Sequence, residues 1–263
     1  MSTPPTSAAN LAGLTHLADL ADLADLDDHG LAAALAAQAG THLVAIRDQG
    51  GAEGDRQSNE LLLAGLAAAR PADAVLSEES ADSPERLQRE RVWIIDPLDG
   101  TREYGEPPRE DWAVHVALAV GGRAVLGAVA LPAAGGLVLH TGEPPMLPPR
   151  QPGPIRLVVS RTRPPACVDH LLSRLDATLV PMGSAGAKAM AVVRGEADVY
   201  AHSGGQYEWD SAAPVAVAAA AGLHTSRLDG SPLVYNQANP YLPDLLICRP
   251  ELAEDVLAAL RDQ

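Results

Sequence analysis

Two aspartates three positions apart, Asp96 and Asp99, give the strongest chemical signal in the sequence. They belong to the segment W-I-I-D-P-L-D-G-T at residues 93–101, where an apolar strand delivers Asp96 at its end and Pro97 interrupts the strand because it has no N–H. A tight turn can bring both carboxylates to one point, with the carbonyl of Leu98 between them. Hard oxygen ligands of this kind are typical of Mg²⁺ sites. Taken alone, the residues also fit a strand followed by an ordinary Asx turn.

Two further segments offer carboxylates of the same kind. Glu78 lies in Ser77-Glu78-Glu79 after a short apolar strand, where paired carboxylates repel each other unless a cation or proton separates them. The alternative there is a solvated acidic loop. Asp210 lies in Glu208-Trp209-Asp210, directly before an alanine-rich helix. It is either the N-cap of that helix or a metal ligand held rigidly by it.

Groups that suit an anion occur at two other places. The backbone N–H groups of Gly100 and Thr101 can face an anion, and Gly100 lets the backbone approach it closely. The segment Gly183-Ser184-Ala185-Gly186 opens the helix that contains Lys188. A turn of small residues at a helix N-terminus favours a phosphate, although a plain capped helix start is the alternative.

The hydrophobic pattern predicts the elements that hold these groups. A run of strands is followed by alternating strand and helix, which indicates an α+β / α/β fold of two joined subdomains. We expect helices over 30–47, 55–70, 166–175, 185–194, 210–221 and 251–261, and strands over 74–77, 91–95, 113–120, 123–131, 136–140, 155–159, 197–201 and 245–248.

The proline-rich segment 142–154 is expected to join the two subdomains. This gives an α+β metal-binding subdomain at 29–150 and an α/β subdomain at 151–263 that completes the active site. Residues 1–28 are expected to form an acidic, partly helical tail. Its Leu and Asp recur every three residues, which gives no lasting stripe on a helix of 3.6 residues per turn. A partner-binding helix is the alternative for this tail.

Composition excludes several classes of function. The formal net charge of −15 disfavours binding to a nucleic-acid polymer. No stretch is long and apolar enough for a membrane helix, and no secretory signal is visible. Two cysteines in 263 residues are too few for a disulfide framework, so we expect a cytoplasmic protein. A small phosphorylated substrate remains compatible with the charge if metal ions supply the cation, and a homodimer is also compatible.

The ordered set S-E-E, W-I-I-D-P-L-D-G-T, G-S-A-x-x-K and W-D resembles the inositol monophosphatase superfamily of Mg²⁺-dependent, lithium-sensitive phosphatases. The resemblance covers about residues 31–248. It implies a layered αβαβα sugar-phosphatase fold and two or three Mg²⁺ ions. It also implies hydrolysis of a phosphomonoester by direct in-line attack of water, without a covalent phosphoenzyme.

The same resemblance implies roles for individual residues. Glu78 and Thr101 match the pair that orients and activates the attacking water, and Asp55 matches an acidic residue near a weaker third metal position. The backbone of Gly100 and Thr101 would hold the phosphate. The metal ligands would be Glu78, Asp96, Asp99, Asp210 and the carbonyl of Leu98.

Within the superfamily, the sequence is similar to bacterial 3′-phosphoadenosine-5′-phosphate phosphatases, which act in sulfur assimilation. Arg102-Glu103-Tyr104 after Thr101 resembles the K-E-F of that group, with Arg in place of Lys and Tyr in place of Phe. Extra cations would pair with a bisphosphate nucleotide. The expected substrate contacts are Asp99, Gly100, Thr101, Arg102, Ser160, Arg161, Gly183, Ser184, Lys188 and Asp210.

Two other interpretations stay open from the sequence. The same scaffold could serve an inositol-1-phosphate or fructose-1,6-bisphosphate phosphatase. Arg102 and Lys188 favour a bisphosphate nucleotidase over these enzymes only weakly. A metal-binding regulatory protein without catalysis is the third hypothesis. It is disfavoured because every matched catalytic carboxylate is present.

Overall fold

The computed structural model describes residues 20–261 of the chain. Residues 1–19 of the predicted acidic tail therefore lie outside the described residues. The last part of that tail forms the short helix α1 (Leu20–Ala24), and its Leu23 is buried against α3 (Gly51–Ala69). The predicted division at residue 28 stays a prediction, although Leu23 belongs to the hydrophobic core.

The first five-stranded sheet has the order β1-β2-β3-β4-β5. Strand β1 pairs with β2 in parallel, and every other pair in the sheet is antiparallel. The helices α2 (Asp28–Ala45) and α3 pack on one face of this sheet. The strands are β1 (Ala74–Ser77), β2 (Arg91–Asp99), β3 (Ala113–Val120), β4 (Arg123–Leu131) and β5 (Leu137–His140).

The second five-stranded sheet has the order β7-β6-β8-β10-β9 and follows the proline-rich segment. Helices α5 (Cys167–Arg174) and α8 (Ala253–Leu260) pack on one face of this sheet. On its other face, α6 (Ala185–Val193) and α7 (Glu208–Ala220) lie between the two sheets. The strands are β6 (Ile155–Ser160), β7 (Ala177–Met182), β8 (Val199–Tyr207), β9 (His224–Ser226) and β10 (Tyr241–Cys248).

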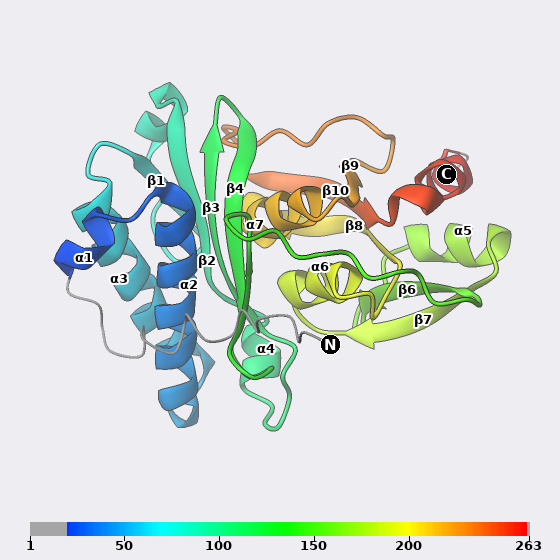
Figure 1. Cartoon of the computed structure of the whole chain (residues 1–263), viewed down its shortest axis with the longest axis horizontal. Coiled ribbons are helices and arrows are strands. Elements are labelled where there is room, and N and C mark those ends of the chain that lie inside the picture. The colour runs from blue at the N-terminus through cyan, green and yellow to red at the C-terminus, as the bar shows by residue number, and fades with distance from the viewer. Residues whose placement is uncertain (1–19, 262–263) are drawn as a thin grey trace, which may run out of the picture.

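The elements therefore form five layers, helix–sheet–helix–sheet–helix, as Figure 1 shows from α2 and α3 across to α5 and α8. This confirms the predicted layered αβαβα fold. Successive side chains of β2 point to opposite faces of the sheet, so this strand packs against two layers of helices. Val92 and Ile94 face α6 and α7, whereas Trp93 and Ile95 face α2 and α3. Many of the buried residues are Ala, Val and Leu, as expected from a sequence without Phe.

Several boundaries differ from the sequence prediction. Strands β7 and β9 were not predicted, and β2 continues to Asp99 instead of ending at Ile95. Pro97 lies in a shift of register between Asp96 and Asp99, so pairing is interrupted there and then resumes. Helix α7 begins at Glu208, two residues before the predicted start, so Asp210 lies in its first turn.

Small residues let α7 approach the first sheet closely. A Cβ on Gly127 of β4 would lie 2.8 Å from the Cα atom and 2.9 Å from the carbonyl oxygen of Ala213 in α7. Both are backbone atoms, so a larger residue at this position must displace the helix that carries Asp210.

We expect Gly127→Ala to lower the free energy of unfolding by about 1–3 kcal/mol, as overpacking of a filled core does. Urea denaturation measures this change. Val125→Ala is the matched control, because Val125 is on the same strand and is 49% exposed. Equal stability of the Gly127 variant and the wild type would show that α7 can shift at no cost.

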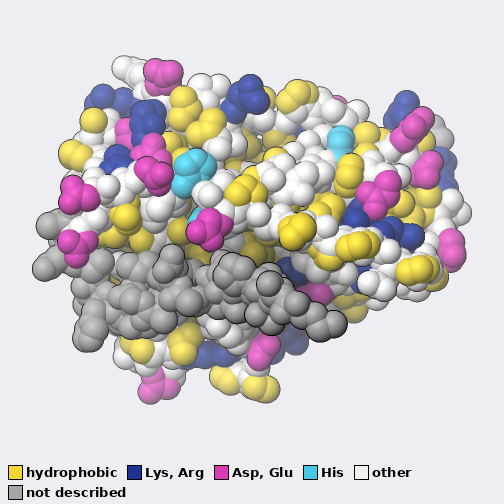
Figure 2. Space-filling view, in the orientation of Figure 1, with side chains coloured by type: hydrophobic (Ala, Val, Ile, Leu, Met, Phe, Trp, Pro, Cys, Tyr) yellow, Lys and Arg dark blue, Asp and Glu magenta, His cyan; other side chains and the backbone are white. Residues whose placement is uncertain are grey.

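Among the described helices, none combines the length and apolar character needed to cross a bilayer. On the face shown in Figure 2, acidic side chains are spread over both ends of the molecule and are not gathered in one place.

Candidate active site

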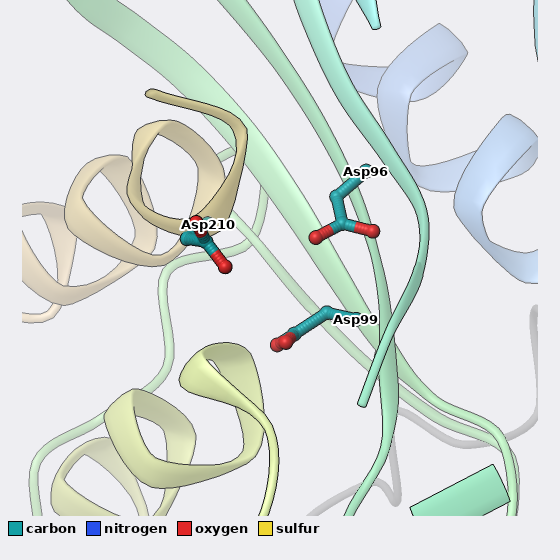
Figure 3. Close-up of side chains that lie close together, drawn as sticks. All are labelled: Asp96, Asp99 and Asp210. Carbon is teal, nitrogen blue, oxygen red and sulfur yellow. The ribbon is translucent and has the colours of Figure 1, made fainter. Parts of the chain in front are cut away.

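Three aspartates come together between the two sheets. Asp96 and Asp99 come from the end of β2, and Asp210 comes from the first turn of α7 (Figure 3). One carboxylate oxygen from each lies within 4.8 Å of the others. Both Asp96 and Asp99 are buried, and Asp210 is partly buried.

Local hydrogen bonds hold the turn between Asp96 and Asp99. The Leu98 N–H donates to Asp96 Oδ1 at 3.1 Å, and the Ser58 hydroxyl of α3 donates to the Pro97 carbonyl at 2.7 Å. Gly100 then adopts φ 87°, a left-handed conformation that favours glycine. At the other end of the cluster, the Tyr207 N–H donates to Asp210 Oδ2 at 2.7 Å. Asp210 is therefore the N3 residue of a capping box whose N-cap is Tyr207, so it is not itself the N-cap considered from the sequence, and it also belongs to the carboxylate cluster.

The carboxylate of Asp99 caps the N-terminus of α6. It accepts hydrogen bonds from the Ser184 hydroxyl at 2.5 Å, the Gly186 N–H at 2.6 Å and the Ala185 N–H at 3.1 Å. Ser184 has φ 46°, which is uncommon for a residue with a side chain. Its hydroxyl also accepts from the Ala187 N–H at 2.9 Å, which helps to hold this backbone conformation. The predicted anion-binding turn thus binds Asp99 in this structure.

His115 of β3 joins the two parts of the cluster and was not predicted from the sequence. Its Nε2 lies 3.2 Å from Asp99 Oδ2, and its Nδ1 lies 3.0 Å from the Trp209 carbonyl oxygen. Because a carbonyl oxygen can only accept, Nδ1 carries a proton. The side chain is fully buried, and Gly186 leaves room for it. The strand register pairs His115 with Asp96, and no sequence pattern reveals that pairing.

Burial and mutual repulsion raise the pKa of four carboxyl groups in and around the cluster. At Asp96, burial followed by the charges of Asp99 and Glu78 places the pKa well above its ordinary value. Burial and the charge of Asp99 raise the pKa of Glu78 and of Asp210 to about 7. Burial and the charge of Glu79 do the same for Asp55.

Asp99 behaves differently from the other carboxyl groups. Burial alone would raise its pKa, but the hydrogen bond and charge of His115 and the charge of Lys188 outweigh burial and lower it. The pKa of His115 is raised in turn, because the hydrogen bond and charge of Asp99 outweigh the effect of burial. The site thus holds one stable anion beside carboxyl groups that lack a counter-charge.

The metal-free protein is expected to lose stability as the pH rises from about 4 to about 7. The lower limit is the ordinary pKa of a carboxyl group. The upper limit is the folded-state pKa of about 7 of Glu78, Asp210 and Asp55. Across this window the folded state binds more protons than the unfolded state, so the free energy of unfolding falls with pH. Urea denaturation in a chelator at several pH values measures this, and saturating Mg²⁺ should reduce the slope. A rise in stability across the window would contradict the prediction.

The cluster fits a divalent cation. Its three carboxylates are close together, burial and mutual repulsion raise the pKa of Asp96 and Asp210, and the nearby Asp55 Oδ1 is buried without a hydrogen-bond partner. Oxygen donors of this number and charge suit Mg²⁺ or a similar hard ion. The residues that could hold such ions are Asp96, Asp99, Asp210, Glu78 and the carbonyl of Leu98.

Thr101 lies at the edge of the cluster. Its hydroxyl is 3.2 Å from Asp55 Oδ2 and 3.2 Å from the Leu98 carbonyl oxygen. The side-chain partner of Thr101 is therefore Asp55, while Glu78 interacts with Asp96 and Asp99. The structure brings Thr101 into contact with Asp55, and the charge of Asp55 in turn acts on Glu78.

A cavity of about 280 Å³ opens beside Asp99 and Asp210. Lys188 lines it but is only 5% exposed, because its ammonium donates to the carbonyls of Gly183 and Ser184. The predicted substrate contacts that line the cavity are Asp99, Gly100, Thr101, Arg102, Ser160, Gly183, Ser184, Lys188 and Asp210.

Arg161 is the one predicted contact that does not line this cavity. Its guanidinium pairs with Glu103 at 2.8 Å and Glu106 at 2.6 Å. Arg163, two residues further on, lines the cavity together with Thr162 and His202. Side chains alternate along an extended chain, so the sequence pattern puts Arg161 and Arg163 on the same side and cannot tell which of them lines the cavity.

The comparisons with known proteins agree on one family. The sequence profile of the Inositol monophosphatase family matches residues 47–263. A protein of Mycobacterium tuberculosis (strain CDC 1551 / Oshkosh) called 3′-phosphoadenosine 5′-phosphate phosphatase is 56% identical over 219 residues, which are 81% of this chain and 82% of the relative. A protein of Mycobacterium leprae (strain TN) with the same name is 50% identical over 254 residues, 89% and 94% of the two chains.

The fold is also similar to that of solved structures. The crystal structure of inositol monophosphatase-II from Staphylococcus aureus MSSA476 superimposes with a TM-score of 0.76 at 19% identity. The superposition covers 89% of this chain and 95% of the other. At this identity the similarity concerns the fold alone.

Proposed function

This chain belongs to the inositol monophosphatase family, and we propose that it is a Mg²⁺-dependent phosphomonoesterase that hydrolyses 3′-phosphoadenosine 5′-phosphate to AMP and phosphate. The observation that carries the proposal is the cavity itself. Its lining includes the aspartates Asp99 and Asp210 and the basic residues Arg102, Arg163 and Lys188. A substrate with two phosphate groups can meet both kinds of surface. The two mycobacterial relatives that carry this activity in their names support the choice of substrate.

The aspartates Asp96, Asp99 and Asp210, together with Glu78, would hold the metal ions. When bound, Mg²⁺ lowers the pKa of a water molecule and offsets the negative charge of the phosphate. Asp99 is kept ionised for this task by His115 and by the N-terminus of α6. The rigid β2 turn and the start of α7 fix the ligands before substrate arrives, which is what preorganised sites require.

Thr101 is placed to orient the attacking water. Its hydroxyl donates its single proton to Asp55 or to the Leu98 carbonyl, so its lone pairs are free to accept a hydrogen bond from water. We assign the released proton to Asp55, whose carboxylate lies 3.2 Å from the Thr101 hydroxyl and can accept the proton through it. Glu78, the partner predicted from the sequence, lies beside Asp96 and supports the metal ions.

Arg163 is expected to bind the 5′-phosphate of the substrate. It is exposed in the cavity, and within residues 20–261 no carboxylate pairs with it, whereas Arg161 is neutralised by two glutamates. We predict that Arg163→Ala lowers kcat/KM for 3′-phosphoadenosine 5′-phosphate about tenfold, the effect of losing about 1.4 kcal/mol of charge-assisted hydrogen bonding.

Adenosine 3′-phosphate is the matched control for this variant, because it lacks only the 5′-phosphate. Its kcat/KM should be the same for Arg163→Ala and the wild type. An equal loss for both substrates would mean that Arg163 supports the fold of the cavity and does not read the second phosphate.

The proposed function is tested by measuring phosphate release with Mg²⁺ from three compounds in parallel. These are 3′-phosphoadenosine 5′-phosphate, inositol 1-phosphate and fructose 1,6-bisphosphate. A preference for the nucleotide of about 100-fold in kcat/KM, about 2.7 kcal/mol, is the expected result. A preference for either sugar phosphate would keep the metal centre and overturn the substrate assignment. Release from none of them would overturn the proposal.

We also place the protein in the cytoplasm. Cys167 and Cys248 are both buried and form no disulfide with each other. Unpaired thiols are usual in a reducing compartment.

A further inference from the structure

Arg86 is a buried cation that the proposed mechanism does not use. It lies in the short 3₁₀ helix η4 (Pro84–Gln88), in the connection between β1 and β2 that begins with Glu78. Its side chain is only 1% exposed, although the connection around it is largely exposed. Burial of an arginine requires that its donors be satisfied, so its partners indicate what it holds in place.

The guanidinium of Arg86 joins two distant segments. It donates twice to Asp82 in its own connection, at 2.6 and 2.8 Å. It also donates to the side-chain oxygen of Asn236 at 2.7 Å and to the carbonyl of Gln237 at 2.9 Å. The Asn236 side chain returns a hydrogen bond to the Arg86 carbonyl at 3.1 Å. The connection that carries Glu78 is thus bound to the loop that precedes β10.

The same two loop residues are bound from the other side by Glu208. Its carboxylate accepts from the N–H of Asn236 at 2.6 Å and from the N–H of Gln237 at 2.7 Å. Glu208 is 1% exposed and is the first residue of α7, two positions before Asp210. Asn236 and Gln237 are therefore held between Arg86 and Glu208, whose opposite charges also attract each other.

The connection is fixed at its beginning as well. Asn59 of α3 accepts from the Ser77 hydroxyl at 2.7 Å and donates to the Ser80 hydroxyl at 3.1 Å. Glu78 lies between these two serines. The chain from Glu78 to Arg86 is therefore attached to α3 at one end and to the start of α7 at the other.

We propose that Arg86 is a positioning residue for the metal centre, which fixes Glu78 relative to Asp210 through the Asn236–Gln237 loop and Glu208. The proposal rests on the proposed function for the identity of the cation, Mg²⁺. Groups that orient metal ligands from outside the ligand set raise metal affinity because the ligands need less reorganisation on binding. Without Arg86, the connection would lose its attachment to the Asn236–Gln237 loop, and only the contacts of Asn59 would hold the chain around Glu78.

Arg86→Ala is expected to weaken Mg²⁺ binding about tenfold, a change typical of losing such an orienting group. Isothermal calorimetry of the full chain with MgCl₂ and no substrate measures this directly. Arg86→Lys should give an intermediate Kd, because lysine can reach fewer of the partners. At saturating Mg²⁺, KM for the substrate should stay at the wild-type value.

Arg156→Ala is the control for a general loss of stability. Arg156 forms an ion pair of 2.8 Å with the fully buried Asp198 in the second sheet, away from the cluster. This variant should unfold more easily but bind Mg²⁺ as the wild type does. Weaker binding in Arg156→Ala by the same factor would overturn the proposal, because the effect would then follow stability alone.

Asn236→Gly keeps the test valid if Arg86→Ala does not fold. Asn236 has φ 57°, which glycine adopts readily, and glycine keeps the backbone N–H that Glu208 binds. The variant removes only the side-chain bridge to Arg86 and should weaken Mg²⁺ binding several-fold. An unchanged Kd in this variant and in Arg86→Lys would overturn the proposal. Wild-type Mg²⁺ binding without phosphate release from any ester would contradict the proposed function and leave this inference intact.

Discussion

Asp96→Asn is expected to reduce kcat/KM for phosphate release by at least about a thousandfold, which corresponds to about 4 kcal/mol of transition-state stabilisation. Asp96 is buried at the centre of the carboxylate cluster, and its charge is needed to hold a divalent cation there. Asparagine has nearly the same shape, and its oxygen can still accept the hydrogen bond from the Leu98 N–H. The loss of activity would therefore come from the loss of charge and not from a change in packing.

The stability of the same variant should move in the opposite direction. In the metal-free protein, burial and the charges of Asp99 and Glu78 disfavour ionised Asp96. Removing that charge should leave the melting temperature in a chelator equal to or above that of the wild type. Saturating Mg²⁺ should raise the melting temperature of the wild type and have little effect on the variant. A metal-free variant that melts well below the wild type would contradict this account of the cluster.

Gly186→Ala is expected to lower both stability and activity, although alanine is intrinsically the better helix former by about 1 kcal/mol. A Cβ at this position would lie 2.0 Å from His115 Nε2. His115 cannot move aside, because it is fully buried between Asp99 and the Trp209 carbonyl. We expect the free energy of unfolding to fall by about 1–3 kcal/mol.

The activity of this variant should fall by about 100-fold, or about 2.7 kcal/mol, because the Gly186 N–H binds Asp99 directly. Urea denaturation and steady-state kinetics measure the two effects. The double variant Gly186→Ala/His115→Ala provides the control, since removal of the imidazole vacates the space that the new methyl group needs. It should be no less stable than His115→Ala alone. A double variant in which the two losses simply add would show that the clash is elsewhere.

The parts of the site that could be predicted from the sequence are those fixed by neighbouring residues. Asp96 and Asp99 lie at the end of one strand and share one turn. Pro97 lies between them and Gly100 follows Asp99, and both residues fix the backbone of the turn. Asp210 was located by the helix that follows it in the sequence pattern, and it lies in the first turn of α7. The change from a run of strands to alternating strand and helix is visible along the chain and indicated two joined subdomains, and the family resemblance implied their layered arrangement.

The parts that could not be predicted depend on pairing between distant segments. His115 looks like one polar residue in an apolar strand until the register of β2 and β3 pairs it with Asp96 and its side chain reaches Asp99. Arg161 and Arg163 have the same chemistry, and only the positions of Glu103 and Glu106 decide which of them is neutralised. Strand β7 was missed because it is half exposed and contains Pro181, and a proline in a sequence argues against a strand. The proline is accommodated because β7 lies at the edge of its sheet.

The placement of the cluster between the two sheets has a consequence for the order in which the protein is made. Glu78, Asp96 and Asp99 leave the ribosome well before α6 and α7, which hold the groups that anchor Asp99 and supply Asp210. A nascent chain at that stage has a run of carboxylates without the partners that draw them together. We therefore expect Mg²⁺ to be captured only late in synthesis, after the chain has passed Asp210. By that point three strands of the second sheet, β6, β7 and β8, have already been synthesised.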